Sequence, residues 1–395
     1  MKQGLSKPYI SFNFSLKTFF FSNFCMALLI SITGCHSNKD QNQQQKDSTS
    51  IAYQLPNPTP INTDSAARYN SVCNYWFDSF LKNSRFNGGM IVAKHGTVVF
   101  EKYQGTGHLN ANDIVNENTP FHIASVSKTF TAMAVLKLWQ DKKINIDDEF
   151  SKYFPDFNYP GVTIRCLLNH RSGLPNYVHF AESLGWDTKK TLTNQDVLQL
   201  LIEKSAMLNI GRPDAYFDYC NTNYALLALI IEKVSTLSFA NYLDQTIFKP
   251  LGMNHSFVFS MDKADSVLQS YRFNNQKEPF MFLDAVYGDK NIYSTPRDMM
   301  KWDMALYDTS FFSQKLTEEA FKGYSYERKG VKNYGLGWRL YEMPSGKKIV
   351  YHNGWWHGNN SVFSRLPQDT TAIIVLGNKF NRSIYQAKKI AGIFD

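Results

Sequence analysis

The stretch FHIASVSKTFTAMAVLKLW (Phe121–Trp139) places a serine and a lysine three residues apart at the expected start of a helix. Positions i and i+3 of a helix lie on one face, so the side chains of Ser125 and Lys128 are within reach of each other. A serine hydroxyl is a weak nucleophile that needs an adjacent base, and a neutral lysine can be that base. The alternative is an ordinary polar pair in a first helical turn, and these residues alone do not decide between the two.

The position at a helix start adds a second feature to this serine. Backbone N–H groups in the first turn of a helix lack intrahelical partners, and the helix dipole favours negative charge there. An oxyanion formed beside Ser125 would therefore meet a ready hydrogen-bond donor.

Patterns outward from this helix predict the fold class. Residues 88–103 predict two strands joined by a turn at His95-Gly96. Four further β-rich segments follow near the end of the chain: 334–342, 347–354, 359–367 and 371–378. Between the first two strands and these four segments, the sequence predicts helix starts at Thr163, at Thr193 and at Ser294 or Thr295. We expect an α/β (α+β) fold: an antiparallel sheet built from both chain ends and flanked by helices, with an inserted, mainly helical lobe.

The expected domain organisation has three parts. Residues 1–34 are expected to be a lipoprotein signal peptide, and 35–64 a flexible polar tether. Residues 65–395 are expected to form the folded domain. Its sheet lobe would take about 65–135 and 290–395, and its helical lobe about 136–289. The active site would lie at the seam between the two lobes.

The N-terminus carries the pattern of an export signal. Three lysines precede the short apolar run FFFSNFCMALLISITGC (19–35). Small residues directly before Cys35 resemble the bacterial lipoprotein signal, in which this cysteine is lipidated. An uncleaved membrane anchor and plain secretion are the alternatives, although polar residues interrupt the apolar run. We expect a cell-envelope protein, anchored through a lipid to a membrane and facing the periplasm or the exterior.

Composition narrows the class of function. The 395 residues are 43% apolar and 15% aromatic, which excludes a largely disordered chain. The formal net charge of +8 comes from scattered basic residues, so we expect no nucleic-acid partner. Outside the N-terminal segment the cysteines are Cys73, Cys166 and Cys220, an odd number without metal-ligand spacing. No disulfide framework and no cysteine metal site are therefore expected.

The segment FDYCNTNY (217–224) offers a second group of site residues. In an extended segment Tyr219 and Asn221 point the same way, and Cys220 points into the core. A phenol can relay a proton, and a carboxamide can bind a substrate amide. The alternative is that Tyr219 and Asn221 only cap the helix that follows.

The segment VYHNGWW (350–356) offers a third group. It places His352, a potential cation, near Gly354, which allows a close backbone approach. The N–H of Trp355 could then complete an oxyanion hole with that of Ser125. A turn glycine beside a hydrogen-bonded histidine is the alternative.

Together these motifs resemble the serine β-lactamase and penicillin-binding-protein superfamily, in its class C-like branch of D-Ala-D-Ala carboxypeptidases, esterases and β-lactamases. The resemblance runs from about Phe86 to Asn378. It rests on SVSK, YCN and HNG, with GVTIRCLLNHRSGLPNY, IFKPLGM, YSTPRDMMKW and YGLGW as further landmarks.

The resemblance implies a role for each residue. Ser125 would attack an amide, lactam or ester carbonyl to form an acyl-enzyme, and Lys128 would accept its proton. Tyr219 would share in proton transfer, and Asn221 would hold the acyl-side amide of the substrate. The N–H groups of Ser125 and Trp355 would form the oxyanion hole, without metal or organic cofactor.

Two departures from the family pattern concern the substrate. His352 stands where many members have a lysine, and Asn353 replaces the usual hydroxyl residue, which weakens recognition of a substrate carboxylate. These departures argue against a dedicated β-lactamase, and the expected cell-envelope location favours peptidoglycan peptides. We expect a cell-envelope D,D-peptidase or esterase acting on a small molecule or a peptidoglycan peptide. A class C-type β-lactamase and a binding or sensor module without turnover are the alternatives. The oligomeric state stays open.

Overall fold

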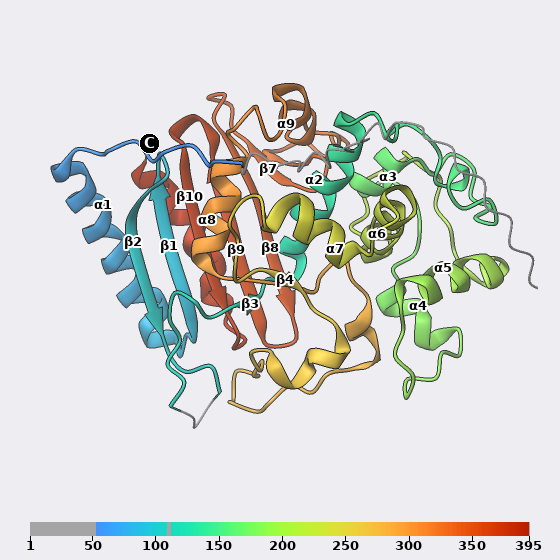
Figure 1. The fold of residues 1–395 in the computed structure, drawn as a ribbon, viewed down its shortest axis with the longest axis horizontal. Helices are drawn as coiled ribbons and strands as arrows, with labels where there is room; N and C mark the ends of the chain where they lie inside the picture. The colour runs from blue at the N-terminus through green and yellow to red at the C-terminus, as the bar shows by residue number, and fades with distance from the viewer. Residues whose placement is uncertain (1–52, 109–111, 395) are drawn as a thin grey trace, which may run out of the picture. The chain divides into compact units, whose positions relative to one another are not determined.

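A seven-stranded antiparallel sheet organises the described chain (Figure 1). The computed structural model describes residues 53–108 and 112–394. The predicted signal peptide, Cys35 and most of the tether lie outside these residues. The strand order is β2-β1-β10-β9-β8-β7-β6. The strands are β1 (Gly88–Lys94), β2 (Thr97–Gln104), β6 (Lys332–Tyr334), β7 (Arg339–Glu342), β8 (Lys348–Trp356), β9 (Asn359–Leu366) and β10 (Thr371–Gly377).

Pairing between β1 and β10 joins the two ends of the chain, from Gly88 opposite Gly377 to Lys94 opposite Thr371. This confirms the prediction that strands from both ends of the chain form one antiparallel sheet. The β1–β2 turn also matches the prediction, because His95 and Gly96 both have positive φ, at 51° and 75°.

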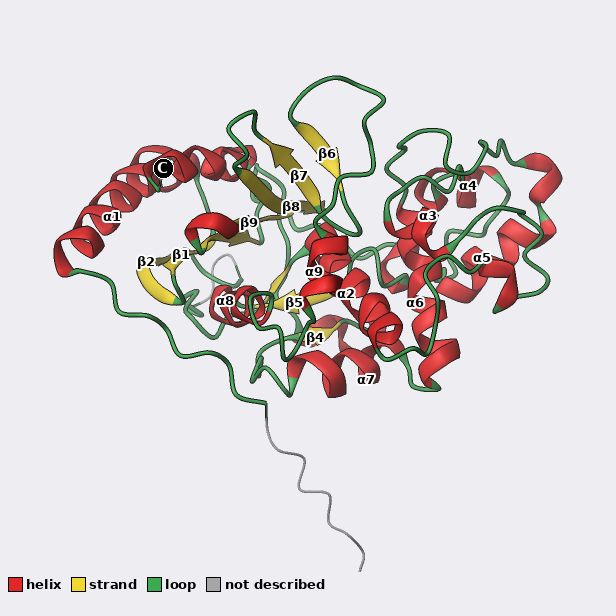
Figure 2. Cartoon of the chain, turned by 90° about the horizontal axis from the view of Figure 1, so that it is seen from above, coloured by secondary structure: helices red, strands yellow, loops and turns green. Residues whose placement is uncertain are grey.

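The helices are α1 (Thr63–Trp76), α2 (Ser127–Gln140), α3 (Ile164–Leu168), α4 (Tyr177–Ser183), α5 (Asn194–Glu203), α6 (Asn221–Ser235), α7 (Phe239–Leu243), α8 (Pro296–Ala305) and α9 (Gln314–Ala320). Figure 2 shows α1 over one face of the large sheet, and α8 and α2 on the other side. Three predicted caps are present, because the side chains of Thr163, Thr193 and Thr295 each accept a hydrogen bond from a first-turn N–H. The C-terminal segment, Arg382–Ile393, is a 3-10 helix.

A second, three-stranded sheet was not predicted. It contains β3 (Phe121–His122), β5 (Ile292–Ser294) and β4 (Phe257–Val258), in the order β3-β5-β4. Strands of two or three residues are too short to show an alternating pattern. This small sheet matters for the site because β3 leads directly into the serine-lysine segment.

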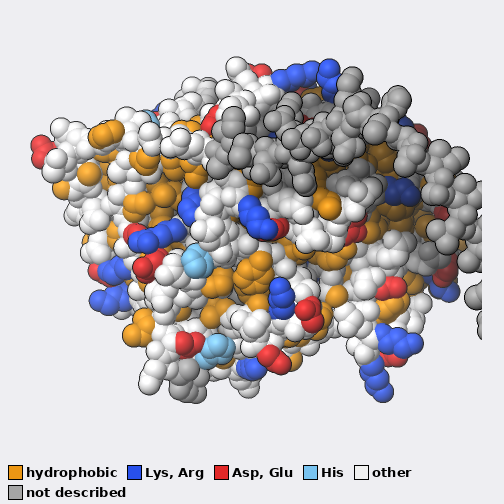
Figure 3. Space-filling view, in the orientation of Figure 1, with side chains coloured by type: hydrophobic (Ala, Val, Ile, Leu, Met, Phe, Trp, Pro, Cys, Tyr) orange, Lys and Arg blue, Asp and Glu red, His pale blue; other side chains and the backbone are white. Residues whose placement is uncertain are grey.

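The helix of the opening stretch is the centre of the core. Nearly every residue of α2 is buried, and α2 packs against α6, whose middle is also buried. Among the described residues no single helix is long and apolar enough to cross a membrane, although α6 and Phe239–Phe248 pass that test as a pair bent by 76°. Cys73, Cys166 and Cys220 are free and buried. On the coloured part of the face in Figure 3, basic and acidic side chains are interspersed.

Candidate active site

A strained turn presents Ser125. This serine lies in a 3-10 turn, Ala124–Val126, between β3 and α2, and its side chain is partly exposed. Ala124 has a φ of +49°, a conformation that non-glycine residues rarely adopt. Such strain persists only where surrounding contacts hold it. One contact comes from β9, where the Ser361 hydroxyl donates to the Ile123 carbonyl oxygen at 2.6 Å.

Lys128 is fully buried and lies within hydrogen-bond distance of the serine. Its Nζ is 3.2 Å from Ser125 Oγ, 2.8 Å from Asn221 Oδ1 and 2.7 Å from the Asp289 carbonyl oxygen. A neutral amine has two N–H donors and one lone pair. The two carbonyl oxygens can accept both N–H groups, which leaves the lone pair for the hydroxyl of Ser125. The geometry therefore suits a general base.

Tyr219 lies beside this pair. It precedes α6 and is partly exposed, and Lys128 Nζ lies 5.1 Å from its ring centroid. Cys220 between Tyr219 and Asn221 is extended, with φ −134° and ψ 121°. Its Sγ lies 3.4 Å from the Pro175 carbonyl oxygen, and its side chain is in the core, as the alternation predicts.

Strand β8 forms the opposite side of the site, and Gly354 lets it approach the serine turn. A Cβ added at Gly354 would lie 2.5 Å from the Ile123 carbonyl oxygen and 2.9 Å from Ala124 Cβ. Only glycine fits this spacing. The next residue, Trp355, belongs to the same strand, and its side chain is 60% exposed. The two residues predicted to form the oxyanion hole, Ser125 and Trp355, thus belong to segments that are in van der Waals contact.

His352 is fully buried, whereas Asn221 is partly exposed and Trp355 is exposed. Burial, and then the positive charge of Arg339, hold the pKa of His352 well below its usual value. The imidazole is therefore neutral near pH 7. This position does not support the idea that His352 is a cation in contact with substrate.

Hydrogen bonds define a buried layer behind Tyr219. His352 Nδ1 donates to the Asn353 carbonyl oxygen at 2.8 Å, so its Nε2 accepts from the Tyr334 hydroxyl at 3.3 Å. His170 Nδ1 accepts from the Cys220 N–H, so its Nε2 donates to the Tyr334 oxygen at 3.2 Å. The pKa of His170 is also lowered, chiefly by burial. Two neutral histidines and one tyrosine thus fix the ring of Tyr219, which lies 4.4 Å from that of His170.

One cation of the site, Arg339, belongs to none of the predicted site motifs. The Arg339 guanidinium carbon lies 4.8 Å from the centroid of the Tyr219 ring and 5.9 Å from that of Tyr334. Arg339 is half-buried, and no carboxylate of the described residues forms an ion pair with it. It follows the YGLGW landmark by one residue, but no motif pointed to it. Its closeness to Tyr219 depends on pairing between β7 and β8, where Arg339 lies opposite Tyr351.

The assembled groups fit acyl transfer. They comprise a partly exposed hydroxyl, a buried amine, a phenol and a strand approaching the hydroxyl from the other side. In the described ranges no three histidine, cysteine, aspartate or glutamate residues are grouped as a metal site would need.

Comparisons with known proteins agree with this geometry. The family model Beta-lactamase matches residues 75–392. Penicillin-binding protein 4* of Bacillus subtilis is 31% identical over 326 residues, which cover 78% of this chain and 72% of the relative. The crystal structure of a penicillin binding protein from Bacillus halodurans has a TM-score of 0.70 at 24% identity, over 81% of this chain and 99% of the other. D-amino acid amidase from Ochrobactrum anthropi, complexed with L-phenylalanine, has a TM-score of 0.66 at 23% identity, over 81% and 98%.

Proposed function

The chain belongs to the beta-lactamase family and is a serine hydrolase, and we propose that it cleaves D-amino-acid peptides of the cell envelope through an acyl-enzyme on Ser125. The observation that carries the proposal is the contact between Lys128 Nζ and Ser125 Oγ at 3.2 Å. Asn221 Oδ1 and the Asp289 carbonyl oxygen orient that amine.

The reaction would proceed in two halves. In the first, Lys128 takes the hydroxyl proton while Ser125 Oγ attacks the carbonyl carbon, and the N–H groups of Ser125 and Trp355 bind the oxyanion. The C–N bond then breaks, and Tyr219 passes a proton to the leaving amine. In the second half, water attacks the acyl ester, and Lys128 and Tyr219 take the proton of that water. Ser125 Oγ regains a proton when its bond to the acyl group breaks.

Arg339 supports a substrate with a free carboxylate. A peptide that ends in a D-amino acid carries this charge on its leaving group. His352 is neutral and buried, so it would not bind the carboxylate. A guanidinium group is a cation that can bind a carboxylate with two hydrogen bonds, and Arg339 supplies one beside Tyr219. One protein of similar fold is named a D-amino acid amidase, which is in keeping with a D-configured substrate.

Ester hydrolysis is the second candidate. The exposed indole of Trp355 lies 5.8 Å from the Phe380 ring and gives the oxyanion side an apolar wall. Such a wall can accept the acyl group of an uncharged ester. Esters also need no cation for binding.

A substrate panel tests these proposals. We expect the wild-type protein to release D-alanine from a D-Ala-D-Ala peptide over many turnovers, and Ser125→Ala to be inactive. Turnover of p-nitrophenyl esters without any peptide cleavage would replace the peptidase proposal with the esterase. Rapid turnover of nitrocefin would identify a β-lactamase. Covalent labelling by penicillin without turnover of any substrate would instead indicate a binding or sensor module.

The location of the protein is a separate proposal. We propose that Cys35 carries the lipid that tethers the domain to a membrane, on the strength of the N-terminal signal pattern. Metabolic labelling with a fatty acid and membrane fractionation test it. Cys35→Ala should lose the label and leave the membrane fraction, whereas membrane retention of an unlabelled protein would indicate an uncleaved anchor.

A further inference from the structure

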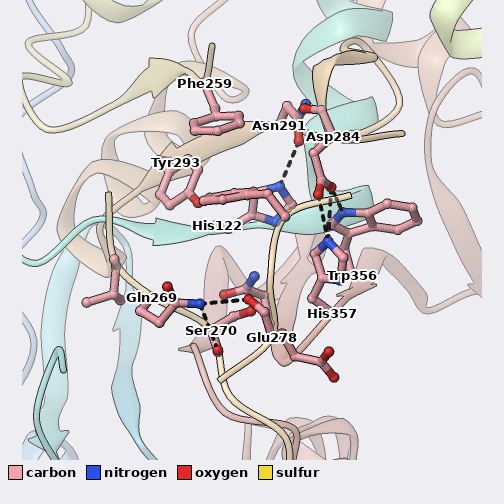
Figure 4. A pocket seen from close by; sticks show the side chains of 13 residues that line it. His122, Phe259, Gln269, Ser270, Glu278, Asp284, Asn291, Tyr293, Trp356 and His357 are labelled. Atoms are coloured by element: carbon pink, nitrogen blue, oxygen red, sulfur yellow. Dashed lines mark hydrogen bonds and ion pairs between the residues drawn. The ribbon is translucent and has the colours of Figure 1, made fainter. Parts of the chain in front are cut away.

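A buried polar network adjoins the serine turn, and the reaction steps do not use it (Figure 4). His122, Asn291 and Asp284 are its buried members, at 3%, 1% and 2% exposure. Burying such groups is costly unless their hydrogen bonds are made, and a satisfied network holds the segments that contribute to it rigid. This network connects the serine turn with the end of strand β8.

One end of the network holds the serine turn. His122 Nδ1 accepts from the backbone N–H of Ala124 at 3.2 Å, and His122 Nε2 donates to Asn291 Oδ1 at 3.0 Å. Burial lowers the pKa of His122 to about 4, so the ring is neutral and can accept at one nitrogen and donate at the other. Ala124 is the strained residue directly before Ser125. His122 thus holds the turn that aims both the hydroxyl and the N–H of Ser125.

The other end holds strand β8 just past Trp355. Asp284 Oδ1 accepts from the indole N–H of Trp356 at 2.6 Å, and both carboxylate oxygens lie 3.0 Å from His357 Nε2. Burial raises the pKa of Asp284, but hydrogen bonds from His357, the Met281 N–H and Trp356 outweigh it and hold the pKa below its usual value. The carboxylate is therefore charged and anchors this strand end.

Asn291 connects the two ends. Its side-chain nitrogen donates to the Asp284 carbonyl oxygen at 2.5 Å, while its oxygen accepts from His122. Asn291 has a left-handed backbone, with φ +74°, a conformation that asparagine tolerates. The chain of contacts thus runs from the residue before Ser125 to the residue after Trp355.

We propose that His122, Asn291 and Asp284 are positioning residues that fix the distance between the two oxyanion donors, the N–H groups of Ser125 and Trp355. None of the three needs to touch substrate. The inference rests on the serine-hydrolase activity and not on any one substrate. Displacement of either donor by a fraction of an ångström weakens its bond to the oxyanion more than its fit to the ground state, so kcat falls while KM changes little.

Paired oxo and thiono substrates test the proposal. A thionoester places a sulfur where the oxyanion forms, and sulfur is a weaker acceptor that fits the hole poorly. The oxo-to-thiono ratio of kcat/KM therefore reports on the donors, whereas partial unfolding lowers both rates equally. We expect Asp284→Asn and His122→Phe to lower kcat for the oxoester about 10- to 100-fold and to bring the ratio toward one. His122→Asn keeps an acceptor near the Nδ1 position and should restore most of the ratio.

Asp303→Asn is the matched control. Asp303 is a second buried carboxylate, bonded to Arg365 at 2.5 Å. Arg365 is six residues along β9 from Asn359, the partner of Trp356, or roughly 20 Å away. This variant should lose thermal stability and keep the wild-type ratio.

Two results would overturn the inference. An unchanged oxo-to-thiono ratio in folded Asp284→Asn and His122→Phe would overturn the inference. An equal drop in Asp303→Asn would also overturn it, because the effect would then be general destabilisation. If Asp284→Asn does not fold, the comparison of His122→Phe with His122→Asn decides alone. A wild-type protein that turns over neither ester would contradict the proposed function instead.

Discussion

Gly354→Ala is the substitution that most directly probes how β8 meets the serine turn. The new Cβ would lie 2.5 Å from the Ile123 carbonyl oxygen and 2.3 Å from Ser361 Oγ, below the 3.0 Å that real contacts respect. The Ser361 hydroxyl can rotate away, but the Ile123 carbonyl oxygen is part of the backbone and cannot. The strand must therefore retreat by about 0.5 to 0.9 Å. An oxyanion bond of about 2.9 Å to the Trp355 N–H would lengthen to about 3.4–3.8 Å, at or beyond the limit for a hydrogen bond.

Losing one oxyanion donor typically costs about 10²- to 10³-fold in kcat. We expect Gly354→Ala to lose this factor on an ester substrate, with KM within a few-fold of wild type and thermal stability lowered by overpacking, about 1–3 kcal/mol. Gly392→Ala is the control, because no atom lies within 4 Å of a Cβ at that position. A folded Gly354→Ala protein with wild-type kcat would refute the close-approach argument.

Three further predictions concern charge and protonation. Arg339→Ala should raise KM or lower kcat/KM about 10- to 100-fold for a peptide with a free C-terminal carboxylate. The same constants for the amidated peptide or a neutral ester should change little. Equal losses on all three substrates would contradict carboxylate binding. Tyr219→Phe should lower kcat about 10²- to 10⁴-fold in steady-state assays, and a loss below tenfold would remove the phenol from proton transfer. The buried, neutral His122, His170 and His352 have lowered pKa values, so the unfolded chain binds more protons than the folded one below about pH 6.5. The free energy of unfolding should therefore fall as the pH drops from 6.5 toward 4, by up to about 1.4 kcal/mol per pH unit for each histidine. Denaturant titrations at several pH values measure this. If the unfolding free energy of His122→Asn depends on pH as steeply as that of the wild type, the prediction is contradicted.

The parts of the fold that sequence predicted are those with strong local signals. Continuous runs of apolar residues, rich in valine and isoleucine, mark β1 and β10, and Thr163 and Thr295 start helices because their side chains satisfy first-turn N–H groups. The short strands of the small sheet carry no such signal. Their pairing, for example Phe121 opposite Ser294, depends on tertiary contacts that no local pattern encodes.

The same distinction holds for the site. Ser125 and Lys128 could be paired from sequence because helical spacing alone brings them together. Asp289 and Arg339 could not, because a loop carbonyl and a neighbouring strand reach the site only through long-range packing. The neutral state of His352 follows from its complete burial, which its place on a predicted strand did not reveal.

Intact mass spectrometry after reaction with a fluorophosphonate or penicillin tests the central claim most directly, because it reports the covalent step without assuming the natural substrate. Wild-type protein should gain the mass of one probe, and peptide mapping should place it on Ser125. Ser125→Ala should gain none, and a Lys128→Met variant should react far more slowly while remaining folded. Labelling that persists in folded Ser125→Ala, or a Lys128→Met variant that reacts at the wild-type rate, would contradict the account.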